Sequence, residues 1–342
     1  MKERIKSIDS LRGLSILAVI LIHTTTRTLE TSNFDLVGFS WTLFLNQIMR
    51  FAVPLFMIIS GFVLERSNKV ENYWSFIKRR FTKIFIPYIV WSLFYYFVVY
   101  NNNHDNLTKV FLTGNASYQL YFIPALLIFY LTFPLLHKLV YKVPNKIIFI
   151  IASIVGLIFL YKNYYIKAFD LGDEINAMIL SFVYFVIGVI SGKNKEYIDI
   201  ITNKFKLFLS IPTAFLGILI FIEGKVRYFS TGNYLSYYSQ WRPSVFFYSL
   251  MVALTFYYIF EHTKFKDSFV SRFSRHSFFA FFVHVGVLEL VWNIVGKNYF
   301  YITSVIDGKI IFDPLFFGVV AFISFMVSKL VHKIPMSSKV VG

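Results

Sequence analysis

Long apolar stretches alternate with short polar segments along almost the whole chain. A helix that crosses a bilayer needs roughly 17–25 mostly apolar residues, and ten stretches reach or approach this length. They lie at Leu11–Thr26, Thr42–Leu64, Phe76–Tyr100, Gln119–Leu136, Ile147–Tyr161, Ala177–Gly192, Leu207–Ile222, Val245–Phe260, Ser277–Val295 and Leu315–Val331. The pattern predicts an all-α, polytopic membrane helical bundle with about ten transmembrane helices. Because no long polar segment interrupts the series, residues 1–342 are expected to form a single integral-membrane domain without an appended soluble domain.

The basic residues fall mainly in alternate polar segments, and this sets the expected orientation. If the N-terminus is inside, 24 Lys and Arg residues lie in cytoplasmic segments and 9 in outer ones. This bias follows the positive-inside rule, and it predicts that both termini are cytoplasmic, in a bacterial plasma (inner) membrane. The charged residues Asp9 and Arg12 interrupt the first apolar stretch, and no small-residue cleavage site follows it. A retained helix is therefore predicted rather than a signal peptide.

Composition agrees with a membrane protein and excludes several chemistries. The chain is 57% hydrophobic and 15% charged, whereas a soluble domain carries about 25% charged residues. Its net charge of +16 is distributed in short runs between apolar stretches, so membrane topology explains it better than nucleic-acid binding. The chain has no cysteine, which excludes disulfides, thiolate nucleophiles and cysteine-based zinc sites.

Four ionisable side chains fall inside the predicted spans, where they are costly and are candidates for function. His23 lies in the first span, Arg50 in the second, and His284 and Glu289 in the ninth. With a rise of 1.5 Å per residue, the first two and Glu289 lie roughly 16–22 Å above the cytoplasmic surface, and His284 roughly 13 Å above it. Two plainer interpretations stay open. His23 could be a polar packing contact, and Glu289 could face water near the outer surface.

Two groups of basic residues lie at the expected cytoplasmic surface. Arg12 precedes His23 by eleven residues, which is about 16 Å and three helical turns, so both side chains share one helix face. Asp9 is one turn away from Arg12 and can pair with it. The third span opens with Lys78, Arg79, Arg80 and Lys83. This density of charge suits a phosphate-rich ligand, although a topological flank or binding to anionic lipid headgroups would also explain it.

These residues resemble those of the membrane-bound acyltransferase family 3. The segment Ile8–Leu14, followed by Val19–His23, is similar to the first helix of that family, with its arginine-x10-histidine motif at Arg12 and His23. Four further segments resemble the family in the same order. They are Phe51–Phe56 with Ser60–Phe62, Lys78–Ile84 with Pro87–Tyr88, Leu120–Leu126, and Ser277–Phe279 with Val283–His284. The resemblance therefore extends over nearly the whole chain.

The resemblance implies transfer of an acyl group, usually acetyl or succinyl, from cytoplasmic acyl-coenzyme A to a hydroxyl of a cell-surface glycan or lipid-linked precursor. The catalytic histidine of the family corresponds to His23. The arginine-x-x-arginine motif corresponds to Arg80 and Lys83, where lysine keeps the charge but loses the planar fork. Tyr121 stands where the family commonly has tryptophan, and Val285 stands where a proline often follows the ninth-helix histidine.

The residues and the resemblance together predict a site. His23, Arg50 and Glu289 are predicted to be catalytic, with His23 as general base and Arg50 as oxyanion or glycan ligand. Arg12, Arg79, Arg80 and Lys83 are predicted to bind the donor. Tyr121 and His284 are predicted to contact the acceptor substrate.

No metal site and no permanently bound cofactor are expected, because the histidines show no ligand spacing and acyl-coenzyme A serves as a substrate. The expected partners are a surface polysaccharide or lipid-linked sugar, membrane lipid and glycan-synthesis proteins. The main alternative is a transporter or glycan exporter, which would favour internal repeats and glycine- or proline-broken helices in matching halves of the chain. The sequence pattern predicts neither. A non-catalytic sensor with the same fold is a third possibility, against which the intact Arg12 and His23 argue.

Overall fold

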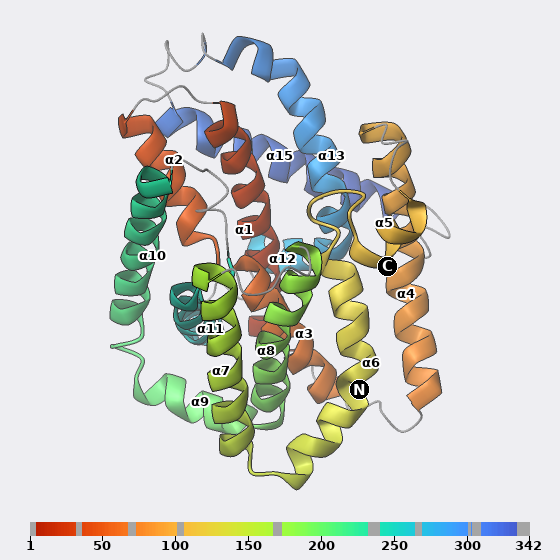
Figure 1. The fold of residues 1–342 in the computed structure, drawn as a ribbon, viewed down its shortest axis with the longest axis vertical. Coiled ribbons are helices and arrows are strands. Elements are labelled where there is room, and N and C mark those ends of the chain that lie inside the picture. Colours follow the sequence, from red (N-terminus) through yellow and green to blue (C-terminus); the bar gives the residue numbers. More distant parts are fainter. Residues whose placement is uncertain are drawn as a thin grey trace.

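The computed structural model describes residues 5–31, 36–67, 73–100, 106–166, 173–231, 240–263, 269–299, 302 and 309–333 (Figure 1). These residues are almost entirely helical, and no strand is found among them. The longer helices are α1 (Lys6–Thr31), α2 (Leu36–Ile48), α3 (Ala52–Ser67), α4 (Tyr73–Phe94), α6 (Phe122–Lys142), α7 (Asn145–Tyr161), α8 (Asp173–Lys193), α10 (Ser210–Thr231), α11 (Pro243–His262), α13 (Ser277–Val295) and α15 (Lys309–Val331). The shorter ones are η1 (Tyr95–Val99), α5 (Leu107–Thr113), η2 (Lys162–Ile166), α9 (Lys195–Lys204), α12 (Phe269–Ser274) and η5 (Gly296–Asn298).

The predicted all-α membrane bundle is confirmed. Within the described ranges, nine helical segments are long and apolar enough to cross a membrane, and each coincides with a predicted span. The remaining predicted span, Leu207–Ile222, falls on α10, whose last turns carry Glu223, Lys225 and Arg227. These charges shorten its apolar stretch. The predicted cytoplasmic position of both termini concerns residues 1–4 and 334–342, which lie outside the described ranges.

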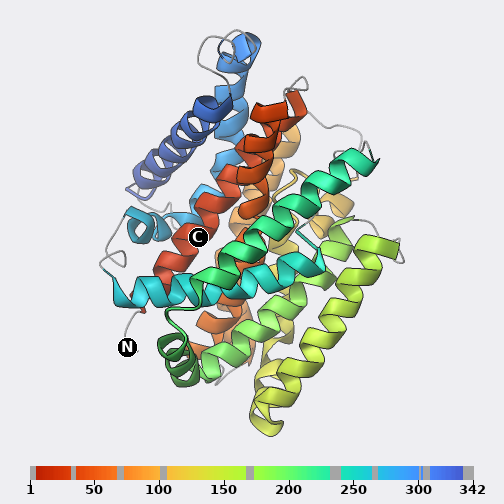
Figure 2. The same cartoon turned by 90° about the vertical axis from the view of Figure 1, so that its left-hand side faces the viewer.

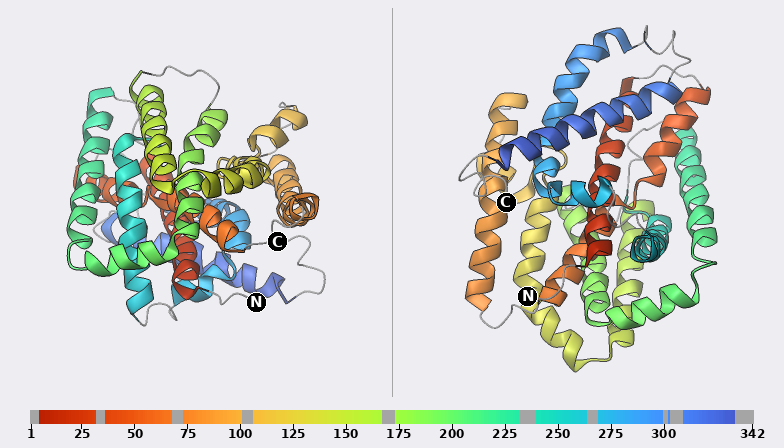
Figure 3. Two further views of the ribbon diagram at one scale, coloured as in Figure 1. Left: turned by 90° about the horizontal axis from the view of Figure 1, so that it is seen from below. Right: turned by 180° about the vertical axis from the view of Figure 1, so that it is seen from behind.

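The helix α1 runs through the middle of the bundle, as Figure 3 shows from below and from behind. It packs against α2, α3, α11, α12, α13 and α15. In contrast, α7 lies at one edge and α15 at the other when the molecule is viewed from the side (Figure 2). The side chains of Ile150, Ile154 and Ile158 on α7 are exposed, as expected for a helix whose apolar surface faces lipid. The packing of the bundle thus places α1, which carries the first predicted motif, at its centre.

The second predicted span is broken into α2 and α3 at Met49–Phe51. Pro54 explains the break, because a proline ring clashes with the carbonyl four residues earlier, which belongs to Arg50. In the first turn of α3 the missing amide proton of Pro54 costs little. The hydroxyl of Tyr248 donates a hydrogen bond of 2.8 Å to the Ile48 carbonyl at the end of α2. The predicted second span therefore consists of two helices joined by a short turn, within one helical segment that is long and apolar enough to cross a membrane.

The close approach of α3 and α8 depends on glycine. A Cβ atom on Gly61 would lie 2.3 Å from the carbonyl oxygen of Phe185, and one on Gly188 would lie 2.1 Å from that of Ile58. Small residues let helix backbones approach closely in membranes, where packing rather than the hydrophobic effect holds helices together. Gly61 belongs to the predicted second-helix motif, and its role in that motif is packing.

Candidate functional site

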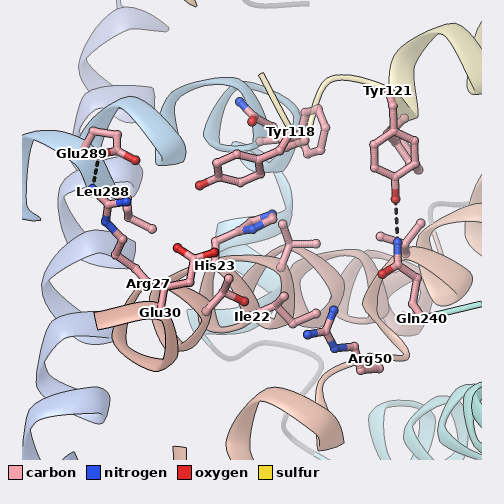
Figure 4. A pocket seen from close by; sticks show the side chains of 16 residues that line it. Ile22, His23, Arg27, Glu30, Arg50, Tyr118, Tyr121, Gln240, Leu288 and Glu289 are labelled. Carbon is pink, nitrogen blue, oxygen red and sulfur yellow. Dashed lines mark hydrogen bonds and ion pairs between the residues drawn. The ribbon is translucent and has the colours of Figure 1, made fainter. Parts of the chain in front are cut away.

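A cavity of about 380 Å³ lies within the bundle, between α1, the Met49–Phe51 turn, the segment before α6, and α13 (Figure 4). Its polar lining residues are His23, Thr26, Arg27, Glu30, Arg50, Tyr118, Gln119, Tyr121, Gln240 and Glu289. Figure 4 shows Arg27 and Glu289 toward one end, and Arg50, Tyr121 and Gln240 toward the other. The three residues predicted to be catalytic therefore line one cavity, although they come from three separate parts of the chain.

His23 lies on α1 between two other rings. The centroid of its imidazole is 4.7 Å from that of Tyr118 and 5.3 Å from that of His284. Among the described residues, no hydrogen bond to the His23 imidazole is found. The ring is thus held by packing, while its nitrogens are available to a ligand in the cavity. This arrangement suits proton transfer with a bound hydroxyl.

His284 lies behind His23 rather than in the cavity wall. Its Nδ1 atom is 3.1 Å from the carbonyl oxygen of Ala280 and 2.8 Å from that of Phe281. Because both partners are acceptors, Nδ1 must carry the proton, and Nε2 is left with a lone pair. Nε2 is buried and has no hydrogen-bond partner within the described part of the chain. The depth count places His284 below His23, yet the structure stacks the two rings together.

Arg50 reaches the cavity because of the helix break. It lies in the turn between α2 and α3, where its backbone amide donates to the Gln47 carbonyl at 3.0 Å. Its side chain is buried, and its Nη2 atom donates a hydrogen bond to Asn46 Oδ1. Non-helical backbone at membrane depth is tolerated where protein buries it or where it lines a cavity, and the turn at Arg50 meets both conditions.

Glu289 forms an ion pair that the sequence did not predict. Its Oε2 atom lies 3.2 Å from Arg27 Nη2, and the two side chains are 20% and 35% exposed. The Arg27 guanidinium also lies over the Trp292 ring, 5.5 Å from its centroid. Arg27 follows His23 by four residues and Glu30 follows it by seven, so all three share one face of α1. That spacing is the sequence signal by which Arg27 and Glu30 could have been found.

The wall opposite α1 comes from the segment that precedes α6. Gly114, with φ of 82°, ends α5 and turns the chain back, and a Cβ atom there would lie 2.5 Å from the Cα of Tyr121. The hydroxyl of Tyr121 accepts a hydrogen bond of 2.9 Å from Gln240 Nε2. Tyr118 carried no signal in the sequence, because it belongs to no motif and to no predicted span.

Three of the predicted donor-binding residues, Arg12, Arg80 and Lys83, lie outside the lining of this cavity. Arg12 pairs with Asp9, with 3.7 Å between Nη1 and Oδ1, which confirms the predicted pair. The Arg80 guanidinium lies 5.9 Å from the centroid of Phe76 and 5.7 Å from that of Tyr130. Lys83 is exposed, and the side chain of Arg79 is outside the described part of the structure. Arg12, Arg80 and Lys83 are not among the residues that line the cavity.

A metal centre is not indicated by the described side chains. Within those residues, no group of three or more histidine and carboxylate side chains is placed to hold a metal ion. The charged groups of the cavity are instead two arginines, Arg27 and Arg50, and two carboxylates, Glu30 and Glu289. Such a set can orient a polar ligand and stabilise charge that develops during a reaction.

The fold and the cavity define a multi-pass membrane protein with an internal polar site. Residues 5–332 match the acyltransferase domain of the acyltransferase 3 family. The chain belongs to this family, and the resemblance seen in the first-helix motif is confirmed. Family membership supports acyltransferase activity in general terms.

Curated relatives carry a different description. The chain is 24% identical over 291 residues to the "Probable poly-beta-1,6-N-acetyl-D-glucosamine export protein" of Staphylococcus aureus strain MSSA476, covering 80% of this chain and 79% of the relative. A protein of the same name from Staphylococcus epidermidis is 22% identical over 314 residues, covering 87% of this chain and 86% of the relative. No solved structure matches the chain.

Proposed function

We propose that the protein is an O-acyltransferase of the bacterial plasma membrane. It transfers an acetyl or succinyl group from cytoplasmic acyl-coenzyme A to a hydroxyl of a cell-surface glycan or lipid-linked precursor. The observation that carries the proposal is the His23 imidazole, which lines a polar cavity together with Arg50 and makes no hydrogen bond to the described residues. Membership of the acyltransferase 3 family supports the reaction type.

In this proposal His23 acts as general base. A neutral imidazole nitrogen accepts the proton of the acceptor hydroxyl while the hydroxyl oxygen attacks the thioester carbonyl carbon. The new C–O bond forms, the C–S bond breaks, and the coenzyme A thiolate leaves and takes up the proton that His23 accepted, which restores the neutral imidazole. Arg50 stabilises the negative charge on the carbonyl oxygen, which is worth most in a site from which water is largely excluded. The products are the acyl ester and free coenzyme A.

The donor enters from the end of α1 that carries Arg12. This residue is about 16 Å along the helix from His23, a distance that an extended pantetheine arm can bridge. Both Arg12 and Arg80 lie near enough to Tyr130 to interact with it electrostatically, so cations from α1 and α4 converge on one region. A cluster of this kind suits the phosphates of coenzyme A.

Glycan export is a second candidate function, and two observations favour it. The relatives from Staphylococcus are named as probable export proteins. The break at Met49–Phe51 also resembles the discontinuous helices from which transporters build their midplane sites. The cavity with its charged and polar lining would then hold a sugar in transit rather than a reacting one.

One experiment separates the two functions. The purified protein is reconstituted in vesicles, supplied with radiolabelled acetyl-coenzyme A on the cytoplasmic side, and given oligomers of N-acetylglucosamine as acceptor. Label transferred to the glycan, and lost in the His23→Ala variant, supports the acyltransferase. Movement of unlabelled glycan across the membrane without transfer of label, and unaffected by His23→Ala, refutes it in favour of export.

A further inference from the structure

A buried polar network lies next to the cavity, on the side of the broken second span. Asn46 and Gln47 are the last polar residues of α2, and both are fully buried. Arg242, immediately before α11, is also fully buried. Charged and amide groups inside a membrane bundle are costly unless each is hydrogen-bonded. Their contacts are therefore informative about what the network holds in place.

The network runs in one direction from α10 to the cavity. Arg242 Nη1 lies 3.5 Å from Glu223 Oε2 and donates to the Ile220 carbonyl at 3.3 Å. Arg242 Nη2 donates to Gln47 Oε1. Gln47 Nε2 then donates to Asn46 Oδ1 at 3.4 Å, and Arg50 Nη2 donates to the same Asn46 oxygen. A continuous series of hydrogen bonds thus ends on the arginine that lines the cavity.

The other side of the Asn46 amide contacts α1 at the turn that carries His23. Asn46 Nδ2 lies 3.2 Å from the carbonyl oxygen of Ile22, the residue directly before His23. It also lies 3.0 Å from the hydroxyls of Thr25 and Thr26. Thr26 itself lines the cavity. The Asn46 side chain therefore contacts both the turn of α1 that carries His23 and the guanidinium of Arg50.

We propose that Asn46 is a positioning residue for the reaction, holding Arg50 and the His23 turn of α1 at a fixed separation. The proposal rests on the acyltransferase function given above. Only an amide can serve in this place, because Oδ1 must accept from Arg50 while Nδ2 must donate to a backbone carbonyl. A carboxylate would lose the donor and face the Ile22 carbonyl, and an aliphatic side chain would lose both contacts. Gln47 donates to the Asn46 oxygen and Arg242 donates to Gln47, so both residues act on Arg50 through Asn46.

The test is the kinetics of Asn46→Ala and Asn46→Asp with purified protein in detergent. The turnover number is expected to fall about 10- to 100-fold, since a hydrogen bond to a charged group is lost, while the Michaelis constant for acyl-coenzyme A stays within about 3-fold. In the Arg50→Ala background, Asn46→Ala is expected to have little further effect, because residues that act as a unit are not additive. Turnover within 2-fold of wild type in a folded variant would overturn the proposal.

A matched control variant removes a polar contact between two helices that lies outside the cavity. Thr213 and Thr255 form a hydrogen bond of 2.8 Å between α10 and α11, away from the cavity lining. Thr213→Ala should leave turnover unchanged, whereas an equal loss in this variant would show that any interhelical hydrogen bond matters and would refute a specific role of Asn46.

If Asn46→Ala does not fold, Gln47→Glu keeps the acceptor for Arg242 and removes the donor to Asn46. About a 3- to 10-fold loss of turnover is then expected, and no loss refutes the proposal. Absence of acyl transfer by the wild-type protein would refute the proposed function itself, which is a separate outcome.

Discussion

The guanidinium of Arg27 on α1 lies 3.2 Å from the carboxylate of Glu289 on α13, across the end of the cavity. The two residues are 262 positions apart in the sequence. Their ion pair ties the helix that carries His23 to the helix that carries His284, whose rings stack on each other. The pair therefore holds together the two helices that supply the imidazoles of the candidate site.

The ion pair can be tested with a double-mutant cycle. Arg27→Ala and Glu289→Ala are each expected to lower the melting temperature, since each leaves a partly buried charge without its partner. Because both side chains are partly exposed, the coupling energy should be modest, about 1 kcal/mol. Thermal melts of the two single variants and the double variant in detergent measure it. Strict additivity would mean that the pair contributes nothing.

His23→Ala is expected to lower acyl transfer by about 10²- to 10⁴-fold, which is the usual contribution of a general base. The variant should insert and fold normally, because the ring makes no hydrogen bond to the described residues. The matched control is His262→Ala, at the exposed end of α11 and outside the cavity, which should keep full activity. Activity of His23→Ala within a few-fold of wild type would show that His23 only packs.

Donor binding and turnover are expected to depend on residues in different parts of the bundle. Arg80→Ala should weaken coenzyme A binding about 10- to 100-fold, since a charge-assisted hydrogen bond to phosphate is lost. Arg50→Ala should leave that affinity nearly intact and lower turnover, because Arg50 lines the cavity with His23. Calorimetric titration of coenzyme A into both purified variants measures the difference. The reverse pattern would contradict the proposed path from Arg12 and Arg80 to His23.

The predicted membrane topology rests on the distribution of basic residues. Reporter fusions after Lys142 and after Lys339 are expected to be cytoplasmic, and one after Asp170 external, since 24 basic residues against 9 favour that orientation. Paired reporters, one active on each side of the membrane, make the measurement. An external C-terminus would contradict both the number of spans and the depths assigned to the ionisable residues.

Gly188 and Gly318 are expected to differ in how strongly the same substitution affects stability. Gly188→Leu is expected to prevent normal folding or cost more than about 3 kcal/mol, because the added side chain would overlap the backbone of α3. Gly318→Leu on α15 should change stability by less than about 0.5 kcal/mol, since nothing lies within 4 Å of a Cβ atom there. Size-exclusion profiles and thermal melts of the two variants provide the comparison. Equal behaviour would mean that α3 and α8 do not approach as closely as described.

The sequence alone determined that the chain forms a bundle of membrane-spanning helices and which residues share a face of one helix. Apolar length and basic flanks are local properties, so nine predicted spans coincide with apolar helices long enough to cross a membrane. The pair of Asp9 with Arg12 was equally predictable, because helical spacing alone brings residues three apart together. Depth counting was enough to suggest that His23, Arg50 and Glu289 belong at one level, since helix rise is constant.

Only the tertiary structure decided which side chains meet. The break at Arg50, the Tyr118 ring against His23, the bond from Gln240 to Tyr121 and the Asn46 network all join segments far apart in the chain. No local pattern encodes such contacts, because they depend on how helices rotate and pack against one another. The apolar pattern also did not indicate the break, since Thr42–Leu64 is long and apolar enough to form one predicted span despite Asn46, Gln47 and Arg50. The sequence thus named three residues that line the cavity, His23, Arg50 and Glu289, and packing around α1 decided that they meet there.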